Sequence, residues 1–92
     1  MSMDVRDNAA ESRYELEVDG KIAIAAYRPR GHALAFVHTE VPEELEGQGI
    51  ASRLVKGALA DVRAKGLKII PACEFVAAYV ERHPEEQDLV AE

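Results

Sequence analysis

The sequence predicts an α/β domain built from a three-stranded antiparallel meander, a long helix, a fourth strand and a short helix. Three observations predict it. Two segments with strand-like alternation flank Asp19-Gly20, a strong hairpin-turn signal. Residues 49–65 carry apolar side chains at helical spacing. A glycine-rich turn, Glu46-Gly47-Gln48-Gly49, stands where an extended segment gives way to that helix.

The meander comes first. Its first strand starts near Arg13, and one face of it carries Tyr14, Leu16 and Val18. The second strand covers residues 21–28, after the hairpin turn. Pro29-Arg30-Gly31-His32 makes the next turn, so a third strand ending near Val41 joins the same sheet. An exposed sheet edge would be capped by a partner chain or protected by the charges of Glu15 and Glu17.

The predicted helix over residues 49–65 packs one face on the sheet through Ile50, Leu54, Val55, Ala58, Leu59 and Val62. Gly66 follows it, as glycine often follows a helix. Residues 67–71 form a short strand, and residues 75–82 form a second helix before His83-Pro84. The connection between the third and fourth strands is long enough for a right-handed crossover, which leaves them parallel or nearly so.

Ninety-two residues suffice for one small core. Residues 1–12 are polar and aperiodic, so we expect a flexible tail followed by a single domain over residues 13–92. The composition, 48% hydrophobic and 30% charged, is typical of soluble globular proteins, and no apolar run approaches the roughly 20 residues of a membrane span. The N-terminus lacks an apolar signal core and Cys73 has no cysteine partner, so we expect a reducing cytoplasm.

The net charge of −6 argues against nonspecific nucleic-acid binding and favours a cationic small molecule or basic peptide as partner. The sequence shows neither a Ser/His/Asp spacing nor a metal-ligand cluster, and its three histidines lie far apart. We therefore expect no metal.

The glycine-rich turn is suited to binding a pyrophosphate. Glycines let the backbone approach phosphate oxygens, and the first amides of the helix point at the anion. The alternative interpretation is that these glycines only shape a strand-to-helix turn.

The element order and this turn resemble the acyl-CoA-binding core of the GNAT superfamily of N-acetyltransferases. The superfamily signature is Arg or Gln, two residues, Gly, one residue, then Gly or Ala. Here it reads Glu46-Gly47-Gln48-Gly49-Ile50-Ala51, with Glu46 departing from the first position. The superfamily also often places a tyrosine on the following short helix, where this chain has Tyr79.

Four segments resemble more narrowly the small, single-domain GNAT-like family labelled YjdJ-type or NATD-type: 38–42, 47–50, 71–76 and 83–85. The resemblance covers roughly residues 13–90. That family lacks the leading strand and helices of a full GNAT domain, which leaves little protein to form an acceptor pocket.

The resemblance implies that acetyl-CoA binds between the third and fourth strands. It places Thr39, Glu40 and Val41 on one wall of the gap, with Ala72 and Cys73 near the other. The amides of Gly47, Gln48, Gly49, Ile50 and Ala51 would hold the pyrophosphate. Arg53 or Lys56 would reach an outer phosphate, unless both are simply solvated helix charges.

Four side chains are candidates for the chemistry. Tyr79 is suited to return a proton to the CoA thiolate, or is a core aromatic. His38 and Glu40, on one face of their strand, are candidate bases; otherwise His38 is a core histidine and Glu40 a solvated charge. Cys73 would accept and pass on the acetyl group in two steps, or is an unreactive thiol.

The sequence thus predicts an acetyl-CoA-dependent N-acetyltransferase acting on a primary amine. The alternatives are a noncatalytic CoA-binding or protein-interaction module, and a small structural partner that binds no cofactor.

Overall fold

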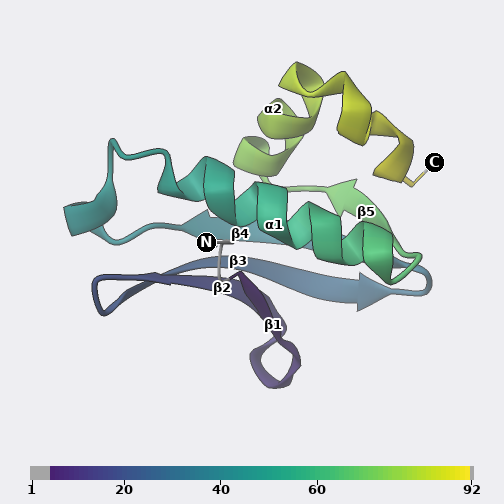
Figure 1. The fold of residues 1–92 in the computed structure, drawn as a ribbon. Coiled ribbons are helices and arrows are strands. Elements are labelled where there is room, and N and C mark those ends of the chain that lie inside the picture. Colours follow the sequence, from purple (N-terminus) through teal and green to yellow (C-terminus); the bar gives the residue numbers. More distant parts are fainter. Residues whose placement is uncertain (1–4, 92) are drawn as a thin grey trace.

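The structure is a computed structural model that describes residues 5–91. Five strands form one sheet in chain order, and α1 lies along one face of it (Figure 1). The strands and helices are β1 (Arg6–Asn8), β2 (Arg13–Val18), β3 (Lys21–Arg30), β4 (Ala33–Glu40), α1 (Ile50–Ala64), β5 (Lys68–Pro71) and α2 (Glu74–Arg82). Short 3-10 turns cover Ala9–Glu11, Glu43–Leu45 and Pro84–Leu89. The predicted α/β architecture is confirmed.

The meander β2–β3–β4 is antiparallel throughout. Asp19 and Gly20 both have positive φ (52° and 77°), as a type I′ hairpin turn requires. β3 runs two residues beyond its expected end, to Arg30, so the next turn is only Gly31-His32. Pro29 is tolerated because β2 pairs with β3 only as far as Ala26, and the flank of β3 beyond that residue has no strand partner.

β5 lies parallel to β4, as the long crossover predicts. α1 supplies that crossover and buries Leu54, Ala58, Leu59 and Val62 completely. The sheet contributes Tyr14, Tyr27 and Phe36, whose ring centroids lie 5.5 to 6.0 Å apart. Each large apolar side chain buried here is worth about 1.5–3 kcal/mol relative to an exposed one, so the α1–sheet contact holds most of the core.

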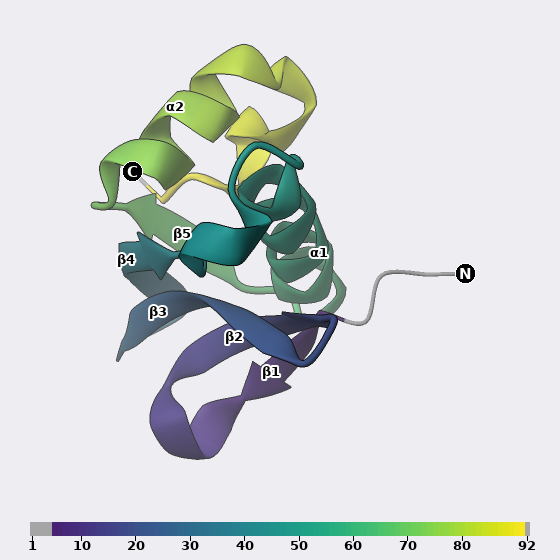
Figure 2. The ribbon, with the colours of Figure 1, turned by 90° about the vertical axis from the view of Figure 1, so that its left-hand side faces the viewer.

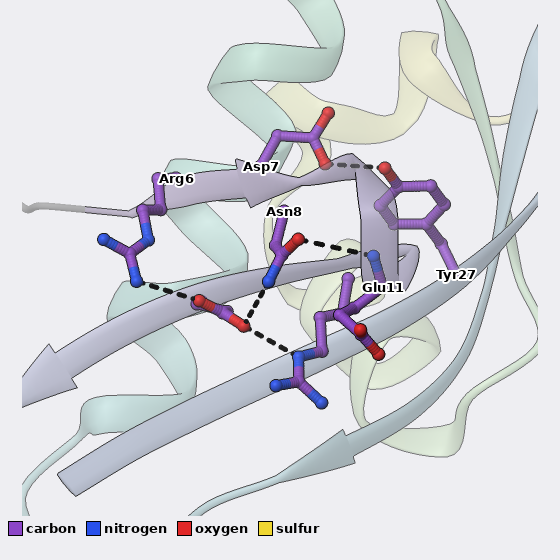
Figure 3. A network of polar contacts seen from close by, with 7 residues as sticks. Arg6, Asp7, Asn8, Glu11 and Tyr27 are labelled. Carbon is purple, nitrogen blue, oxygen red and sulfur yellow. Dashed lines mark hydrogen bonds and ion pairs between the residues drawn. The ribbon is translucent and has the colours of Figure 1, made fainter.

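Residues 5–12 are ordered against the sheet, contrary to the expected tail; residues 1–4 of that tail lie outside the described residues. β1 pairs antiparallel with β2, and its contacts are polar (Figure 3). Asp7 accepts hydrogen bonds from the Tyr27 hydroxyl at 2.6 Å and from Lys65 Nζ at 2.9 Å. Apolar alternation could not identify this strand, because charged groups rather than apolar side chains hold it.

β2 is consequently an interior strand, and Glu15 is buried rather than exposed at an edge. Its carboxylate accepts hydrogen bonds from Arg13 (2.8 Å), Asn8 (3.0 Å) and Arg6 (3.1 Å). The hydrogen bond from Arg13, followed by that from Asn8, lowers the pKa of Glu15 from 4.5 to about 2. This carboxylate is therefore a charged structural group at neutral pH.

Gly57 leaves a notch in the middle of α1 that Val5 occupies. A Cβ atom at position 57 would lie 2.6 Å from Val5 Cγ2 and 2.7 Å from Val5 Cβ. Glycine is a poor helix residue, so its presence here is explained by the close approach of the N-terminal segment.

β4 contains a bulge at Val37. Phe36 pairs with Tyr27 and His38 with Ala26, so Val37 has no partner on β3. Residues that pair across strands share a face of the sheet. Thr39 pairs with Ala25 and thus lies on the face covered by α1, whereas His38 and Glu40 lie on the opposite face. Figure 2 shows that opposite face of β2, β3 and β4 without a covering helix.

Within residues 5–91, no helix combines the length and apolar character needed to cross a membrane.

Candidate active site

The glycine-rich turn joins β4 to α1 and has the backbone that the sequence predicts for an anion site. Gly47 and Gly49 have positive φ, 84° and 73°. A Cβ atom at either position would meet nothing within 4 Å, so the backbone dihedral, and not crowding, requires glycine. The turn is therefore open on the side where these glycines lie.

The N-terminus of α1 is uncapped. Gly49 occupies the N-cap position and has no side chain to accept from the helix, and the first turn carries no acidic residue. Among the described residues, no acceptor bonds the backbone amides of Ile50, Ala51 and Ser52; the first amide bonded in the helix is that of Arg53, which donates to Gly49 O at 3.1 Å. Three amide donors and the positive end of the helix dipole therefore face outward.

A hollow of about 210 Å³ lies over this turn, and most of its lining is apolar. Phe75 of α2 forms the far wall and is 36% exposed. The remaining lining residues are Val41, Leu45, Glu46, Gly47, Gly49, Ile50, Ala51 and Ser52. Phe75 was expected in a helix without a role at the site; the available signal was an aromatic residue two positions after Cys73, the α2 N-cap.

β4 and β5 separate next to this hollow. Their parallel pairing ends at Phe36 and Pro71. The Cys73 amide donates to the Phe36 carbonyl at 2.7 Å and fixes the start of α2 there. Cys73, partly buried at the α2 N-cap, places its Sγ atom 3.4 Å from Thr39 Oγ1 across the opening. The structure thus brings Thr39 and Cys73 together, near Val41 and the glycine turn.

His38 and Glu40 share one face of β4, as expected from their spacing, with 3.7 Å between His38 Nε2 and Glu40 Oε1. Their side chains are 61% and 68% exposed. Neither is a core residue, and they lie on the sheet face opposite to Thr39. The two candidate bases and the thiol therefore approach the β4–β5 opening from opposite sides.

Tyr79 is buried in α2 and stacks on His83, with ring centroids 3.9 Å apart. His83 Nδ1 lies 2.7 Å from the Tyr79 carbonyl oxygen, so that nitrogen carries the proton. Burial, then the charges of Glu86 and Glu85, raise the pKa of Tyr79. The phenol is therefore protonated at neutral pH and has a proton to donate.

The other predicted cofactor residues lie outside the hollow. The Gln48 side-chain amide donates to the Glu44 carbonyl at 3.4 Å. Arg53 and Lys56 are exposed on α1 and form no ion pair with any described residue. They remain available to a ligand that extends beyond the hollow. Across residues 5–91, no three His, Cys, Asp or Glu side chains are grouped to hold a metal ion.

Comparison with known proteins gives a consistent result. Residues 13–89 match the family model described as GCN5-related N-acetyl-transferase. The proteins named NATD1 from Homo sapiens and Gallus gallus are each 42% identical over 52 residues, which is 56% of this chain. The match spans only 46% and 47% of their respective lengths, so the chain aligns with about half of these relatives.

A solved structure is also similar. The solution NMR structure of a GCN5-like protein from Staphylococcus aureus superposes with a TM-score of 0.73 at 27% identity. The superposition covers 98% of this chain and 89% of that one.

Proposed function

The chain belongs to the GCN5-related N-acetyltransferase family, and on that premise we propose that it transfers the acetyl group of acetyl-CoA to a primary amine in a reducing cytoplasm. The observation that carries the proposal is the continuity of the site. An uncapped helix N-terminus borders an apolar hollow, and two residues that line this hollow, Val41 and Phe75, each lie two positions from the pair Thr39 and Cys73 at the strand opening.

The cofactor would bind along this path. The backbone amides of residues 47–51 would hold the pyrophosphate, since they supply donors and a positive dipole end. Val41 and Phe75 would pack against the pantetheine arm, and the thioester would enter the opening beside Thr39 and Cys73. Arg53 or Lys56 would contact an outer phosphate. The Glu46 carboxylate has to point to solvent, because it would otherwise repel the pyrophosphate.

The amine would reach the thioester from the face of the sheet that no helix covers. Its nitrogen attacks the thioester carbonyl carbon, the carbon–sulfur bond breaks, and CoA leaves as a thiolate. Glu40 or His38 takes the proton lost by the amine, directly or through water. The Tyr79 hydroxyl gives its proton to the thiolate and regains one from solvent.

The Cys73 thiolate offers a second route to the same products. It would attack the thioester carbonyl, release CoA and carry the acetyl group as a thioester until the amine displaces it. Thr39 is placed to orient the thiol, since either atom of the 3.4 Å contact is able to donate. The two routes differ in whether acetylated Cys73 accumulates when no amine is present.

The first test is an amide NMR titration with acetyl-CoA, followed by an assay of CoA release with a panel of amines. We expect saturable shifts at Gly47–Ala51 and Cys73, with the distant turn at Gly31 unchanged, and then amine-dependent CoA release. Saturable binding without release from a broad panel would favour a noncatalytic CoA-binding module. No shifts at millimolar acetyl-CoA would refute the proposal.

A further inference from the structure

The sheet face opposite α1 carries exposed apolar side chains among its charged ones. Ile22, Val37 and Ile70 are 41%, 39% and 38% exposed, and they are three of the four exposed large apolar side chains among the described residues. Their strand registers place Ile22 and Ile70 on this face, next to Ile24, Ala26 and Ala35. Exposed apolar side chains on an uncovered face are available to contact a ligand.

A hollow of about 570 Å³ lies where β3 extends beyond its pairing with β2, and Ala26, Arg28 and Arg30 of this face are among its lining residues. Arg28 and Arg30 line it from β3, and Val37 lines it from the β4 bulge. Neither arginine forms an ion pair or a side-chain hydrogen bond with a described residue, whereas Arg6, Arg13 and Arg63 all bind carboxylates. Glu11 is the one carboxylate in the lining. Two adjacent unpaired guanidinium groups in a chain of net charge −6 indicate an anionic ligand.

A second hollow, of about 270 Å³, lies further along the same face and is lined by Ile22, Ile24, Glu40, Pro42 and Arg13. His38 pairs with Ala26 between the two hollows, beside Glu40. At about 3.3 Å per residue, Arg28 and Arg30 lie about 7 and 13 Å along β3 from the level of His38. These intervals match side chains two and four residues apart on an extended peptide.

We propose that the amine acceptor is a polypeptide that lies extended across this face, with acidic residues two and four positions from the reactive lysine. The lysine amine lies at His38 and Glu40, and the two acidic side chains bind Arg28 and Arg30. Val37 contacts the intervening apolar atoms, and Ile24 contacts the peptide on the other side of the lysine. This inference rests on the proposed N-acetyltransferase function and specifies its acceptor. The acceptor is acidic because the local charge near the bulge is positive, opposite to the net charge of the chain.

A second copy of the chain is a poorer occupant of this face. Two molecules of net charge −6 repel each other, and the face is divided by the His38–Ala26 row into two separate hollows. An acidic peptide complements the arginines without requiring a flat, continuous interface.

The test compares short peptides that are blocked at both ends and carry one lysine. One set has Glu two and four residues from the lysine, on its N-terminal or its C-terminal side; matched sets have Gln or Arg there. We expect the better Glu peptide to exceed its Gln match about tenfold in kcat/KM, since each exposed ion pair contributes up to about 1 kcal/mol. The Arg peptide should fall below the Gln peptide, and added salt should reduce the preference.

The double variant Arg28→Gln/Arg30→Gln should reduce the preference to within about twofold. Arg82→Gln, at an exposed arginine of α2 that has no ion pair with a described residue, is the matched control and should retain the preference. Equal kcat/KM for Glu and Gln peptides would overturn the inference, as would a preference that survives in the double variant.

A binding measurement separates this inference from the proposed function. The Glu peptide is titrated into the labelled chain without acetyl-CoA, and shifts are followed at Arg28, Arg30 and Val37. Saturable shifts with the Glu peptide, absent with the Gln peptide, would support binding of an acidic peptide to this face even if no peptide is acetylated. The absence of such shifts would overturn the inference even if another amine is acetylated. A dimer that sedimentation detects and that Val37→Glu dissociates would also overturn it, by assigning this face to a second copy.

Discussion

Thr39 Oγ1 and Cys73 Sγ lie 3.4 Å apart, and this contact crosses the gap between β4 and β5 beyond their last pair, Phe36 and Pro71. The thiol therefore has a hydroxyl neighbour at the point where a thioester would enter. This contact is specific to the bulged form of β4, because the bulge turns Thr39 toward the α1 side.

Cys73→Ser distinguishes the two routes of acetyl transfer. If Cys73 carries the acetyl group, the wild-type chain incubated with acetyl-CoA alone gains one acetyl mass at Cys73, and Cys73→Ser lowers kcat by about 10²-fold or more. Intact-mass spectrometry and CoA release measure the two effects. An unlabelled wild-type chain and an active Cys73→Ser variant would instead establish direct transfer. Thr39→Val should slow acetylation of Cys73 without abolishing it.

Gly49→Ala and Gly31→Ala form a matched pair. Both glycines have positive φ, 73° and 62°, and a Cβ atom at either meets nothing within 4 Å. We expect each substitution to reduce the free energy of unfolding by about 1 kcal/mol through backbone strain. Only Gly49→Ala should weaken acetyl-CoA binding, which isothermal titration measures. Equal affinities for the two variants would mean that the glycine-rich turn serves the fold alone.

Tyr79→Phe should lower kcat by about 10²-fold, the usual effect of removing a general acid. The raised pKa of Tyr79 means that its proton is lost only at alkaline pH, so the wild-type rate should fall there and the variant rate should not. The pH dependence of kcat measures this. Affinity for acetyl-CoA, measured separately, is the control, and a wild-type kcat in the variant would assign Tyr79 to the core only.

Glu15→Gln tests the buried carboxylate. Because the folded pKa of Glu15, about 2, lies below the unfolded value of 4.5, its charge stabilises the fold fully above pH 4.5, and that stabilisation is lost as the pH falls through 2. The variant should be less stable at pH 7 by on the order of 2 kcal/mol, and its stability should depend less on pH between 4.5 and 2. Urea unfolding at several pH values measures this. Glu17→Gln, at an exposed position of the same strand, is the control.

Gly57→Ala and Val5→Gly should be strongly coupled. In a Val5→Gly background, alanine at position 57 should stabilise α1 by about 1 kcal/mol, the ordinary helix preference over glycine. In the wild-type background the new Cβ meets Val5 at 2.6 Å, so the gain should vanish or reverse. A double-mutant cycle in urea measures the coupling free energy. Additive changes in the free energy of unfolding would show that the N-terminal segment moves away from position 57 without loss of stability.

Local sequence patterns were sufficient for most of the fold. The Asp19-Gly20 turn, the α1 helix and the parallel β5 all follow from short-range spacing. β1 could not be found in this way, since its few residues bind through Asp7, Asn8 and Arg6 to partners distant in sequence. For the same reason Glu15 looked like an edge charge although three donors surround it.

The parts of the site that depend on backbone dihedral preferences could be predicted from the sequence. The parts that depend on strand register could not. The glycine turn and the α1 N-terminus follow from residue types with known dihedral preferences. Alternation along a strand predicts that His38 and Thr39 lie on opposite sides of the sheet, but no residue type in 36–40 indicates the bulge, so the sequence could not tell which of the two side chains faces α1. Nor does any local pattern reveal that Arg28 and Arg30 are left unpaired beside Val37, which depends on the neighbours of β3.

The bulge at Val37 also limits how this segment can change in length. Side chains along a strand alternate, so deleting Val37, the residue without a partner, would restore regular pairing and leave His38 opposite Ala26 and Thr39 opposite Ala25, each on its present face. A one-residue insertion between Phe36 and His38, with a bulge of the same size, would instead exchange the two faces: His38 would turn toward α1, and Thr39 toward solvent. This stretch should therefore tolerate the loss of one residue better than the gain of one, because only the insertion rearranges the thiol contact and both candidate bases at once.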